Sequence, residues 1–472
     1  MILVSAGAVR MKVYLETMGC QMNRLDSELV ATHLRAAGHE LVDDRKAADV
    51  VLYNTCSVRR HAEQKVYSRL GADTQRKRHH RPRLVVGVLG CMAQREGEEL
   101  ARRFPGVDVV CGPGQLPRLA GLIEQAAAGR AAIALDPDRQ AATARGDGPD
   151  LDELDLARDP LATASPQKAY VRVGRGCDNF CTYCIVPYVR GPERSREPAR
   201  IVEEVRRLVG AGRGEVTLLG QTVNRYRYDP GGGRAPVRFS DLLERVAAVE
   251  GLRRLRFVTS HPVDFTDDVL AAMRDLPAVC EYIHVPPQSG SDAVLKRMKR
   301  GYSRGEYDDL IDRARATVPG VTVAGDFIVG FPGETEADHA ASAELIRRSG
   351  FKNSFVFKYS PRPGTFAAEH YRDDVPEAVK RRRNQELLAV QQEVGLACHT
   401  ACVGRVVEVL AEGPSVRADK QAAPPTPAAT QLVGRTRGDH IVHFTGPREL
   451  IGRTVRVRVT AATALALLGE PV

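Results

Sequence analysis

The sequence predicts an α/β protein in three parts: an N-terminal parallel α/β sheet domain, a central partial (β/α)6 TIM-like barrel and a small C-terminal antiparallel β-barrel. The first two parts are predicted because short apolar strands alternate with amphipathic helical stretches over residues 11–135 and again over residues 167–398. The third part is predicted because apolar and polar residues alternate between glycine turns over residues 399–470.

Four strands are expected in the N-terminal part, at residues 13–16, 50–54, 84–89 and 107–110. Helical stretches such as DSELVATHLRAAG lie between them, so the strands are expected to run parallel. Met11 opens the first strand, and we interpret residues 1–10 as an N-terminal extension ahead of the native start.

Residues 136–166 are polar and acidic, without aromatic residues or a clear apolar period, and we interpret them as a polar linker. Beyond this linker, the barrel part is expected to have fewer strands than the eight of a complete (β/α) barrel. The expected barrel strands cover residues 170–173, 215–219, 255–259, 282–285, 321–329 and 354–359.

Composition restricts the class of protein. The chain has 472 residues, a formal net charge of +9 and 43% hydrophobic residues, which is enough for buried cores. No apolar run approaches the length of a membrane span and no secretory signal opens the chain, so we expect a cytoplasmic protein without a membrane partner. A basic chain often binds nucleic acid, although a generic basic surface explains the charge equally well. The 10 cysteines then favour metal binding over disulfides.

Cys177, Cys181 and Cys184 form a C-x3-C-x2-C run directly after the first barrel strand. Three thiolates packed this closely suit one iron–sulfur cluster. A cubane cluster has four irons, so three cysteines leave one iron open to a ligand, as in a catalytic zinc site. A zinc site would usually need a fourth Cys or His nearby, and none lies in this loop. A redox C-x-x-C pair would leave Cys177 unused.

A second set of cysteines is spread through the N-terminal part. Cys20, Cys56 and Cys91 each follow a predicted strand. The carboxyl ends of parallel strands share one edge of a sheet, so these three side chains are expected to converge there and hold a second cluster. The alternative is that they are ordinary buried cysteines.

The other cysteines are interpreted as structural. Cys111 also follows a strand and lies within reach of the second set, but we expect a structural role for it. Cys280 is expected in the core. Cys398 and Cys402 are expected to be two free thiols, with pairing to each other as the alternative.

Turns that follow the barrel strands are candidates for cofactor binding, because barrel enzymes place their sites at the carboxyl ends of the strands. Glycines in such turns let the backbone approach a ligand closely. The residues predicted to bind cofactor on this ground are Gly220, Gln221, Ser260, Gln288, Gly330 and Glu334. His261 also follows a strand, and we interpret it as a structural or hydrogen-bonding residue.

Arginines gather around the C-x3-C-x2-C run. Arg190, Arg194 and Arg196 follow it and Arg175 precedes it. They suit RNA phosphates or a cofactor carboxylate, and Arg190 is added to the predicted cofactor-binding residues. A surface position is the alternative, above all for Arg194. The run Arg76–Arg83 is interpreted as a solvated loop, with RNA contact as the alternative.

These motifs together resemble a known family, the tRNA methylthiotransferases, over nearly all of residues 11–468. The C-x3-C-x2-C run on its own resembles the radical S-adenosylmethionine superfamily, and the C-terminal part resembles the small RNA-binding barrel called the TRAM domain. The resemblance rests on the segments MGCQMNRLDSE, NTCSVRRHAEQKV, GCMAQR, CDNFCTYCIVPYVRGPERSR, LGQTVN, SHP, PQSGS, DFIVGFPGET and YSPRPGT.

Within that family, NTCSVR and CTYCIVPYVRGPERSR favour the bacterial branch that acts on N6-isopentenyl(dimethylallyl)adenosine at position 37 of tRNA. The resemblance therefore implies a transferase that inserts a methylthio group at C2 of that base. The nearest alternatives are relatives that act on threonylcarbamoyladenosine in tRNA or on an aspartate of a ribosomal protein. An alternative of another class is a non-catalytic iron–sulfur RNA-binding protein.

The resemblance also implies two 4Fe-4S clusters with separate tasks. Cys177, Cys181 and Cys184 would hold the cluster that cleaves S-adenosylmethionine to a radical. Cys20, Cys56 and Cys91 would hold an auxiliary cluster that supplies sulfur. A monomer is expected, with a one-electron donor such as flavodoxin or ferredoxin. The target base lies in a loop and can stack on aromatic side chains, for which the candidates are Tyr183, Tyr188 and Phe331, with packing inside the protein as the alternative for each.

Overall fold

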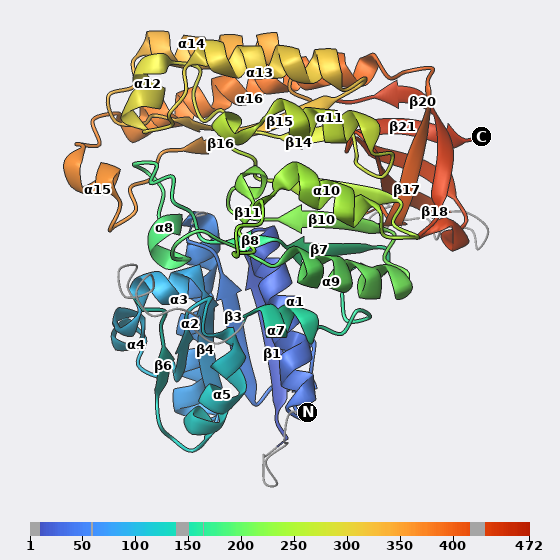
Figure 1. The fold of residues 1–472 in the computed structure, drawn as a ribbon. Helices are drawn as coiled ribbons and strands as arrows, with labels where there is room; N and C mark the ends of the chain where they lie inside the picture. The colour runs from blue at the N-terminus through green and yellow to red at the C-terminus, as the bar shows by residue number, and fades with distance from the viewer. Residues whose placement is uncertain (1–9, 58–59, 138–150, 164, 416–429) are drawn as a thin grey trace.

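The computed structural model of the chain describes residues 10–57, 60–137, 151–163, 165–415 and 430–472. Figure 1 shows three parts in chain order, from the blue N-terminal sheet through the green and yellow barrel to the red C-terminal barrel. The expected N-terminal extension lies outside the described residues apart from Arg10. None of the described helices is long and apolar enough to cross a membrane.

The N-terminal part is a parallel sheet whose described strands lie in the order β2-β1-β3-β4-β5-β6. These strands are β1 (Lys12–Met18), β2 (Glu40–Leu41), β3 (Val50–Thr55), β4 (Val85–Gly90), β5 (Val109–Cys111) and β6 (Ala132–Ala134). Every residue of the central strands β3 and β4 is buried, as expected for a parallel sheet covered on both faces. The parallel α/β prediction is confirmed. The edge strands β2 and β6 are too short to show a sequence pattern.

Helices cover both faces of this sheet and create a hydrophobic core on each (Figure 1). One face packs against α1 (Gln21–Ala36) and α5 (Leu119–Ala127). The other packs against α2 (Arg60–His79), α3 (Cys91–Glu96) and α4 (Glu98–Arg103).

The run Arg76–Arg83, which we interpreted as a solvated loop, begins as the last turn of helix α2. Arg76 donates to the Arg45 carbonyl at 3.0 Å and to the Lys46 carbonyl at 2.8 Å. Arg81 donates to Asp49 at 3.2 Å. The loop interpretation is therefore wrong for residues 76–79, which are helical, whereas residues 80–83 lie outside the helices and strands, as expected for a loop. The contacts of Arg76 and Arg81 join the end of α2 to the segment that leads into β3.

The described part of the predicted linker contains a short helix, α7 (Leu151–Leu156). Leu151 and Leu154 are buried in the core that α1 shares with the sheet. Asp155 is completely buried and accepts hydrogen bonds from Arg172 at 2.9, 3.0 and 3.2 Å. The acidic composition suggested exposure to solvent, but these residues pack and pair with the barrel instead.

The central part is an open (β/α) barrel of parallel strands, as predicted. The described strands form two ladders, β7-β10-β13 and β14-β15-β16. The Ser260 amide joins the ladders by donating to the His284 carbonyl at 3.1 Å. The strands are β7 (Lys168–Arg172), β10 (Glu215–Leu219), β13 (Arg254–Val258), β14 (Tyr282–His284), β15 (Thr322–Val329) and β16 (Asn353–Lys358).

Helices line the outside of this barrel and enclose the largest hydrophobic core of the described chain. They are α9 (Pro198–Gly210), α10 (Phe239–Ala247), α11 (Asp267–Asp275), α12 (Asp292–Arg297), α13 (Arg304–Thr317), α14 (Glu336–Ser349) and α16 (Glu377–Thr400). Shorter elements near the mouth are β8 (Gly174–Arg175), α8 (Val186–Val189), β9 (Arg194–Ser195) and α15 (Phe366–His370).

The C-terminal part is a closed barrel whose described strands follow the order β17-β18-β19-β21-β20. They are β17 (Val406–Pro414), β18 (Thr430–Thr436), β19 (Ile441–Gly446), β20 (Thr454–Ala462) and β21 (Leu467–Pro471). The prediction of a wholly antiparallel barrel is wrong in one respect, because β19 pairs with β21 in parallel. The last strand closes the barrel by inserting between β19 and β20, an arrangement that alternation along each strand does not reveal.

Charged side chains attach the C-terminal barrel to the amino-terminal ends of the central barrel strands. Arg254 donates to the Arg435 carbonyl at 2.8 Å, and Arg256 donates to the Thr436 carbonyl at 2.7 Å. Lys352 pairs with Asp439 at 2.8 Å. This docking covers the amino-terminal ends of the central barrel strands, and the N-terminal sheet packs beside the edge strand β7 (Figure 1).

Candidate functional site

The three N-terminal cysteines, called here the N-terminal trio, stand at the carboxyl ends of neighbouring strands. Cys20 precedes α1 after β1, Cys56 follows β3, and Cys91 opens α3 after β4. A hydrogen bond from the Cys56 thiol is the main reason that the pKa of Cys20 is lowered to about 6. Burial raises the pKa of Cys91, and the charge of Cys20 adds to that rise. The trio therefore shares one electrostatic environment.

A buried amide network holds the loops of the N-terminal trio. The Cys20 amide donates to the Asn23 side-chain carbonyl at 3.2 Å, and the Asn23 amide group donates to Asn54 at 3.1 Å. Asn54 in turn donates to the Asn23 backbone carbonyl and to Ser27 Oγ, both at 2.9 Å. A Cβ at Gly19 would lie 2.3 Å from Asn23 Oδ1, so the network leaves no room for a side chain there. These contacts account physically for the segments MGCQMN and NTC.

The three cysteines of the C-x3-C-x2-C run, called here the barrel trio, lie in the loop after β7 and β8. Cys177 and Cys181 are buried. Burial raises the pKa of Cys177, and it raises the pKa of Cys184 to about 12 with help from the charge of Cys181. Gly176 has φ +73°, and a Cβ there would lie 1.9 Å from the Pro192 carbonyl oxygen. The loop can turn back on itself only because this residue is glycine.

The donor chemistry of both trios fits an iron–sulfur cluster. Among the described residues, no three His, Cys, Asp or Glu side chains gather as one metal ion requires. Thiolates that bind a cubane cluster attach to separate irons and need not converge in this way.

Three residues at the barrel mouth have strained backbone conformations. Phe180 has φ +47°, and Thr259 and Gln288 each have φ +71°. Positive φ is unusual for any residue with a side chain and is a genuine outlier for a β-branched residue such as Thr259. Gln288 is fixed by its amide hydrogen bond to the Asp326 carbonyl at 2.9 Å. Strain of this kind concentrates at functional sites.

Two of the predicted cofactor-binding residues have buried polar atoms that lack a hydrogen-bond partner among the described residues. These atoms are Gln221 Oε1 and Ser260 Oγ. Unpartnered buried polar atoms are costly, so each is suited to a polar ligand. Gly220 and Gln221 line a small cavity of about 10 Å³, together with Arg175.

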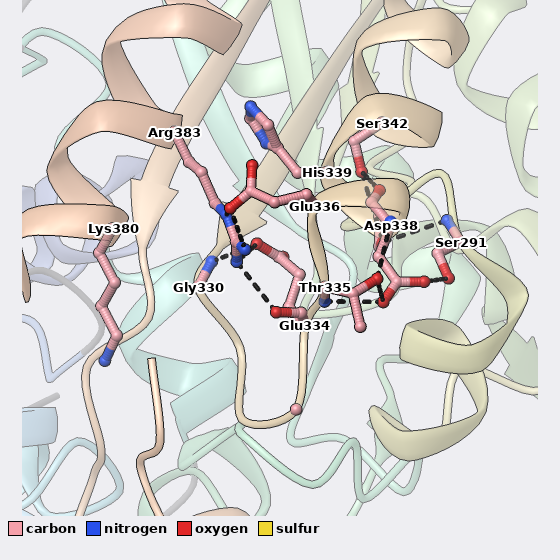
Figure 2. A network of polar contacts seen from close by, with 12 residues as sticks. Ser291, Gly330, Glu334, Thr335, Glu336, Asp338, His339, Ser342, Lys380 and Arg383 are labelled. Atoms are coloured by element: carbon pink, nitrogen blue, oxygen red, sulfur yellow. Dashed lines mark hydrogen bonds and ion pairs between the residues drawn. The ribbon is translucent and has the colours of Figure 1, made fainter. Parts of the chain in front are cut away.

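The predicted residues Gly330 and Glu334 are joined to each other and to helix α16, as Figure 2 shows. Glu334 accepts hydrogen bonds from the Gly330 amide and from Arg383, both at 2.8 Å. Gly330 has φ +70°, and a Cβ there would lie 2.3 Å from Cγ of Lys380. These contacts brace the loop after β15 from within the protein. The cofactor contact of Gly330 and Glu334 stays a prediction.

The arginines near the barrel trio divide into different environments. Arg196 is buried and pairs with Asp152 at 3.0 Å and with Glu204 at 2.8 Å, so neither RNA nor cofactor explains it. Arg194 is half-buried. The Arg175 guanidinium has no hydrogen-bond or ion-pair partner in the described part of the chain, and burial lowers its pKa. Arg175 is therefore the member of this group that is suited to an external anion.

Arg190 joins the segment that follows the barrel trio to the N-terminal trio. It follows helix α8 of the barrel, yet its Nε donates to Cys91 Sγ of the N-terminal trio at 3.2 Å. Its Nη2 donates to Asp26 of α1 at 2.8 Å. The sequence places Arg190 among the predicted cofactor-binding residues. In the structure it lies beside Cys91, a predicted cluster ligand.

His261 takes part in a reciprocal contact that links two predicted segments. The His261 amide donates to Asn224 Oδ1 at 2.8 Å, and Asn224 Nδ2 donates to the His261 carbonyl at 2.9 Å. Burial lowers the pKa of the imidazole to about 2, so the ring stays neutral at physiological pH. This agrees with a structural residue rather than a proton shuttle.

The aromatic candidates differ in exposure. Phe331 is completely buried among Tyr359 and Tyr371, so our suggestion that it stacks on a base is wrong. Tyr183 packs against Phe331 at the edge of the same cluster. Tyr188 is 47% exposed and remains accessible to a base.

The remaining cysteines are free thiols in the structure. Cys111 is completely buried in the N-terminal core, and Cys280 is buried as well. Cys398 donates to the Gly350 carbonyl at 3.4 Å, and Cys402 donates to the Cys398 carbonyl at 3.6 Å.

Sequence reasoning missed Arg300, which is buried beside the barrel trio. Its Nη1 donates to Cys181 Sγ at 3.4 Å across 119 residues of sequence. Its other donors reach the Pro286 carbonyl at 3.1 Å and the Tyr302 hydroxyl at 3.2 Å. No sequence signal separates this arginine from its basic neighbours, because its role follows from the folded loop after α12.

Comparison with known proteins adds independent findings. Residues 12–112 match the family described as Uncharacterized protein family UPF0004, and residues 171–346 match the Radical SAM superfamily. The tRNA-2-methylthio-N(6)-dimethylallyladenosine synthase of Rhodopirellula baltica is 46% identical over 97% of this chain and 95% of its own length. The protein of the same name from Moorella thermoacetica is 44% identical over 97% of each chain.

A solved structure supports the fold. The radical S-adenosylmethionine methyltransferase TsrM from Kitasatospora setae, solved with cobalamin and an iron–sulfur cluster bound, superposes with a TM-score of 0.51. The alignment covers 76% of this chain and 77% of that chain at 16% sequence identity. The likeness therefore concerns the architecture alone.

Proposed function

This chain belongs to the family of the tRNA-2-methylthio-N(6)-dimethylallyladenosine synthases, and from that premise we propose that it carries out the reaction for which they are named. It would insert a methylthio group at C2 of N6-isopentenyladenosine at position 37 of tRNA, as a radical S-adenosylmethionine transferase of sulfur-containing groups. The observation that carries the proposal is the hydrogen bond from Arg190 to Cys91, because it brings the loops of both trios to one interface.

We propose that Cys177, Cys181 and Cys184 hold one 4Fe-4S cluster and that Cys20, Cys56 and Cys91 hold a second. Bound clusters and S-adenosylmethionine would supply the one-electron chemistry and the sulfur that side chains lack. The chain contributes buried thiols, and burial raises the pKa of Cys91, Cys177 and Cys184. Binding of metal to a thiol releases its proton. Arg190 and Arg300 each donate to one sulfur, and such second contacts orient metal ligands.

The barrel mouth supplies polar groups for S-adenosylmethionine. Gln221 and Ser260 have buried polar atoms without partners among the described residues, and the strained Gln288 completes the rim. The guanidinium of Arg175, which has no hydrogen-bond or ion-pair partner among the described residues, is suited to a carboxylate or an RNA phosphate. The exposed Tyr188 is placed to stack on the target base, which can leave its loop for this purpose.

The C-terminal barrel is proposed to bind the tRNA outside the active site, as a TRAM-like domain spanning residues 399–470. Arg453, Arg456 and Arg458 are exposed on it, and exposed arginines provide sequence-independent contacts to phosphates. Residues 11–135 would then form the auxiliary-cluster domain and residues 167–398 the radical domain, with residues 136–166 between them.

The same proposal sets the partners and the place of the reaction. Both trios come from one chain, so we propose a monomer as the active unit. The reaction consumes electrons one at a time, which calls for a small donor protein of the flavodoxin or ferredoxin type. Because tRNA is the substrate, we place the reaction in the cytoplasm.

Mass spectrometry of tRNA nucleosides tests the proposal. A host strain that lacks its own enzyme of this kind should contain N6-isopentenyladenosine without the 2-methylthio group. Expression of this chain should restore the 2-methylthio nucleoside. Restoration of a methylthio group on threonylcarbamoyladenosine instead, or of neither nucleoside, would refute the proposed substrate.

A further inference from the structure

Each trio has one buried arginine that donates a hydrogen bond to a cysteine sulfur. Arg300 donates to Cys181 of the barrel trio at 3.4 Å, and Arg190 donates to Cys91 of the N-terminal trio at 3.2 Å. The two arginines come from different loops of the barrel part: Arg190 follows α8, and Arg300 follows α12. The same contact, from an arginine to a cysteine sulfur, therefore occurs on two unrelated local structures.

The two guanidinium groups differ in how their charge is compensated. Arg190 pairs with Asp26 at 2.8 Å, and Asp26 is itself buried. Every hydrogen-bond partner of Arg300 is neutral or a thiol: the Pro286 carbonyl, the Tyr302 hydroxyl and Cys181 Sγ. Among the described residues, no carboxylate pairs with Arg300, although its residue is only 7% exposed.

A buried cation without a counter-ion is expensive, and the cost is lowest when an anion occupies the neighbouring space. Three thiolates around a cluster provide such an anion next to Arg300. The hydrogen bond to Cys181 Sγ at 3.4 Å places the positive charge of Arg300 directly against the barrel trio.

We propose that Arg300 is a positioning residue that raises the reduction potential of the barrel cluster, whereas the Arg190–Asp26 pair leaves the potential of the N-terminal cluster nearly unchanged. The inference rests on the proposed function, since it requires a cluster on each trio. Reduction adds one electron, taken from the external donor, and a nearby positive charge stabilises the added negative charge. Hydrogen bonds to sulfur and local charge are known determinants of cluster potential. Only the cluster that receives the electron would then have an uncompensated cation beside it.

The test uses the full-length chain with Cys20, Cys56 and Cys91 replaced by alanine, so that only the barrel cluster forms. After anaerobic reconstitution, a redox titration followed by electron paramagnetic resonance gives the midpoint potential. Arg300→Gln should make reduction at least tenfold less favourable, a shift of about 59 mV to more negative potential. Arg300→Lys keeps the charge and should stay closer to the parent than to Arg300→Gln.

Lys296→Gln is the matched control. Lys296 is an exposed lysine of α12, and water and salt screen its charge, so its removal should leave the potential unchanged. An Arg300→Gln potential equal to that of the parent would overturn the proposal. If Arg300→Gln fails to fold, Arg300→Lys still decides, because a shift of tenfold or more with the charge retained would also overturn it.

The N-terminal cluster provides a second test, measured with Cys177, Cys181 and Cys184 replaced by alanine. Arg190→Gln should lower the potential because it leaves the Asp26 charge uncompensated by Arg190. Adding Asp26→Asn should return the potential toward the parent value, and a double variant no closer to the parent than Arg190→Gln would contradict the proposed compensation. Absence of iron from both parent proteins would refute the cluster assignment itself, whereas clusters that form without these shifts would refute only the role of the arginines.

Discussion

The two cysteine trios sit on contrasting kinds of backbone. The N-terminal trio occupies strand-to-helix turns of a parallel sheet, supported by the amide groups of Asn23 and Asn54. The barrel trio lies among loops that contain the strained residues Phe180, Thr259 and Gln288. Within the described residues, the N-terminal sheet shows positive φ only at glycines. The N-terminal trio thus lies on regular structure. The barrel trio lies among strained residues whose conformations the surrounding packing must maintain.

This difference suggests a division of tasks. A trio held by a hydrogen-bonded network suits a cluster that keeps its place through the reaction. Strained loops suit a site where a cofactor binds and leaves, because strain of this kind concentrates at functional sites. Buried polar atoms without a partner among the described residues lie beside both trios, at Thr55 and Ser57 as well as at Gln221 and Ser260. The following predictions test the comparison, from the largest expected effect to the smallest.

Loss of a cluster is the largest effect. The reconstituted chain should bind about eight irons if each trio holds a four-iron cluster. Cys56→Ala and Cys181→Ala should each lower this to about four, measured by iron analysis. Cys280→Ala is the control, because Cys280 is buried away from both trios, and it should retain the full content. An unchanged iron content in Cys56→Ala would contradict the prediction that the N-terminal trio holds a cluster.

Disruption of the interface between the N-terminal sheet and the barrel should be the next largest effect. Asp155 is completely buried, and Asp155→Ala would leave Arg172 without its closest carboxylate. Removing one partner of a buried pair costs about 3–5 kcal/mol in the free energy of unfolding. Denaturant unfolding measures this loss.

The control for that change is Glu203→Ala. Glu203 and Arg206 form an exposed pair at 3.7 Å, and exposed pairs contribute about 0–1 kcal/mol. Equal losses in the two variants would show that the buried charges at the interface do not stabilise the fold more than surface charges do.

The amide network should contribute less than the ion pairs. Asn54→Ala removes two donated hydrogen bonds of 2.9 Å and leaves Asn23 Nδ2 without its acceptor. An unsatisfied buried group costs about 1–3 kcal/mol, and we expect a loss of that size in the free energy of unfolding. Iron bound to the barrel trio should be unaffected in the same variant, and its loss would contradict the independence of the two sites.

Relief of strain should have the smallest effect on stability. Gln288→Gly removes a side chain at φ +71°, and the gain, about 1 kcal/mol, is partly offset by the entropy of glycine. The KM for S-adenosylmethionine should rise if Gln288 contacts the cofactor. Lys299→Gly is the matched control, because Lys299 has φ +56° but is exposed. An equal rise in the KM for S-adenosylmethionine in both variants would contradict a contact between Gln288 and the cofactor.

Much of this organisation was predictable from sequence because it depends on local periods. Strand and helix patterns were sufficient to place Cys20, Cys56 and Cys91 at the ends of neighbouring strands and to indicate the six barrel strands. The same patterns misjudged α7, because acidic residues look solvated until their buried arginine partners are known. They also gave no sign that β21 runs parallel to β19.

The roles of individual polar residues were much harder to predict. Arg300 reaches Cys181 from 119 residues away, and Arg383 braces Glu334 from 49 residues away (Figure 2). Such contacts depend on how loops meet in the folded protein. Motif spacing predicted the ligands of each proposed cluster, whereas the charges around them required the structure.

The central claim is that the two trios do different work in one reaction, and product analysis tests it most directly. The reconstituted chain is incubated with S-adenosylmethionine, a reductant and tRNA containing N6-isopentenyladenosine, and both 5′-deoxyadenosine and the 2-methylthio nucleoside are quantified by mass spectrometry. The account predicts that replacing Cys20, Cys56 and Cys91 by alanine abolishes the nucleoside product while 5′-deoxyadenosine still forms. Continued formation of the 2-methylthio nucleoside by that variant would contradict it.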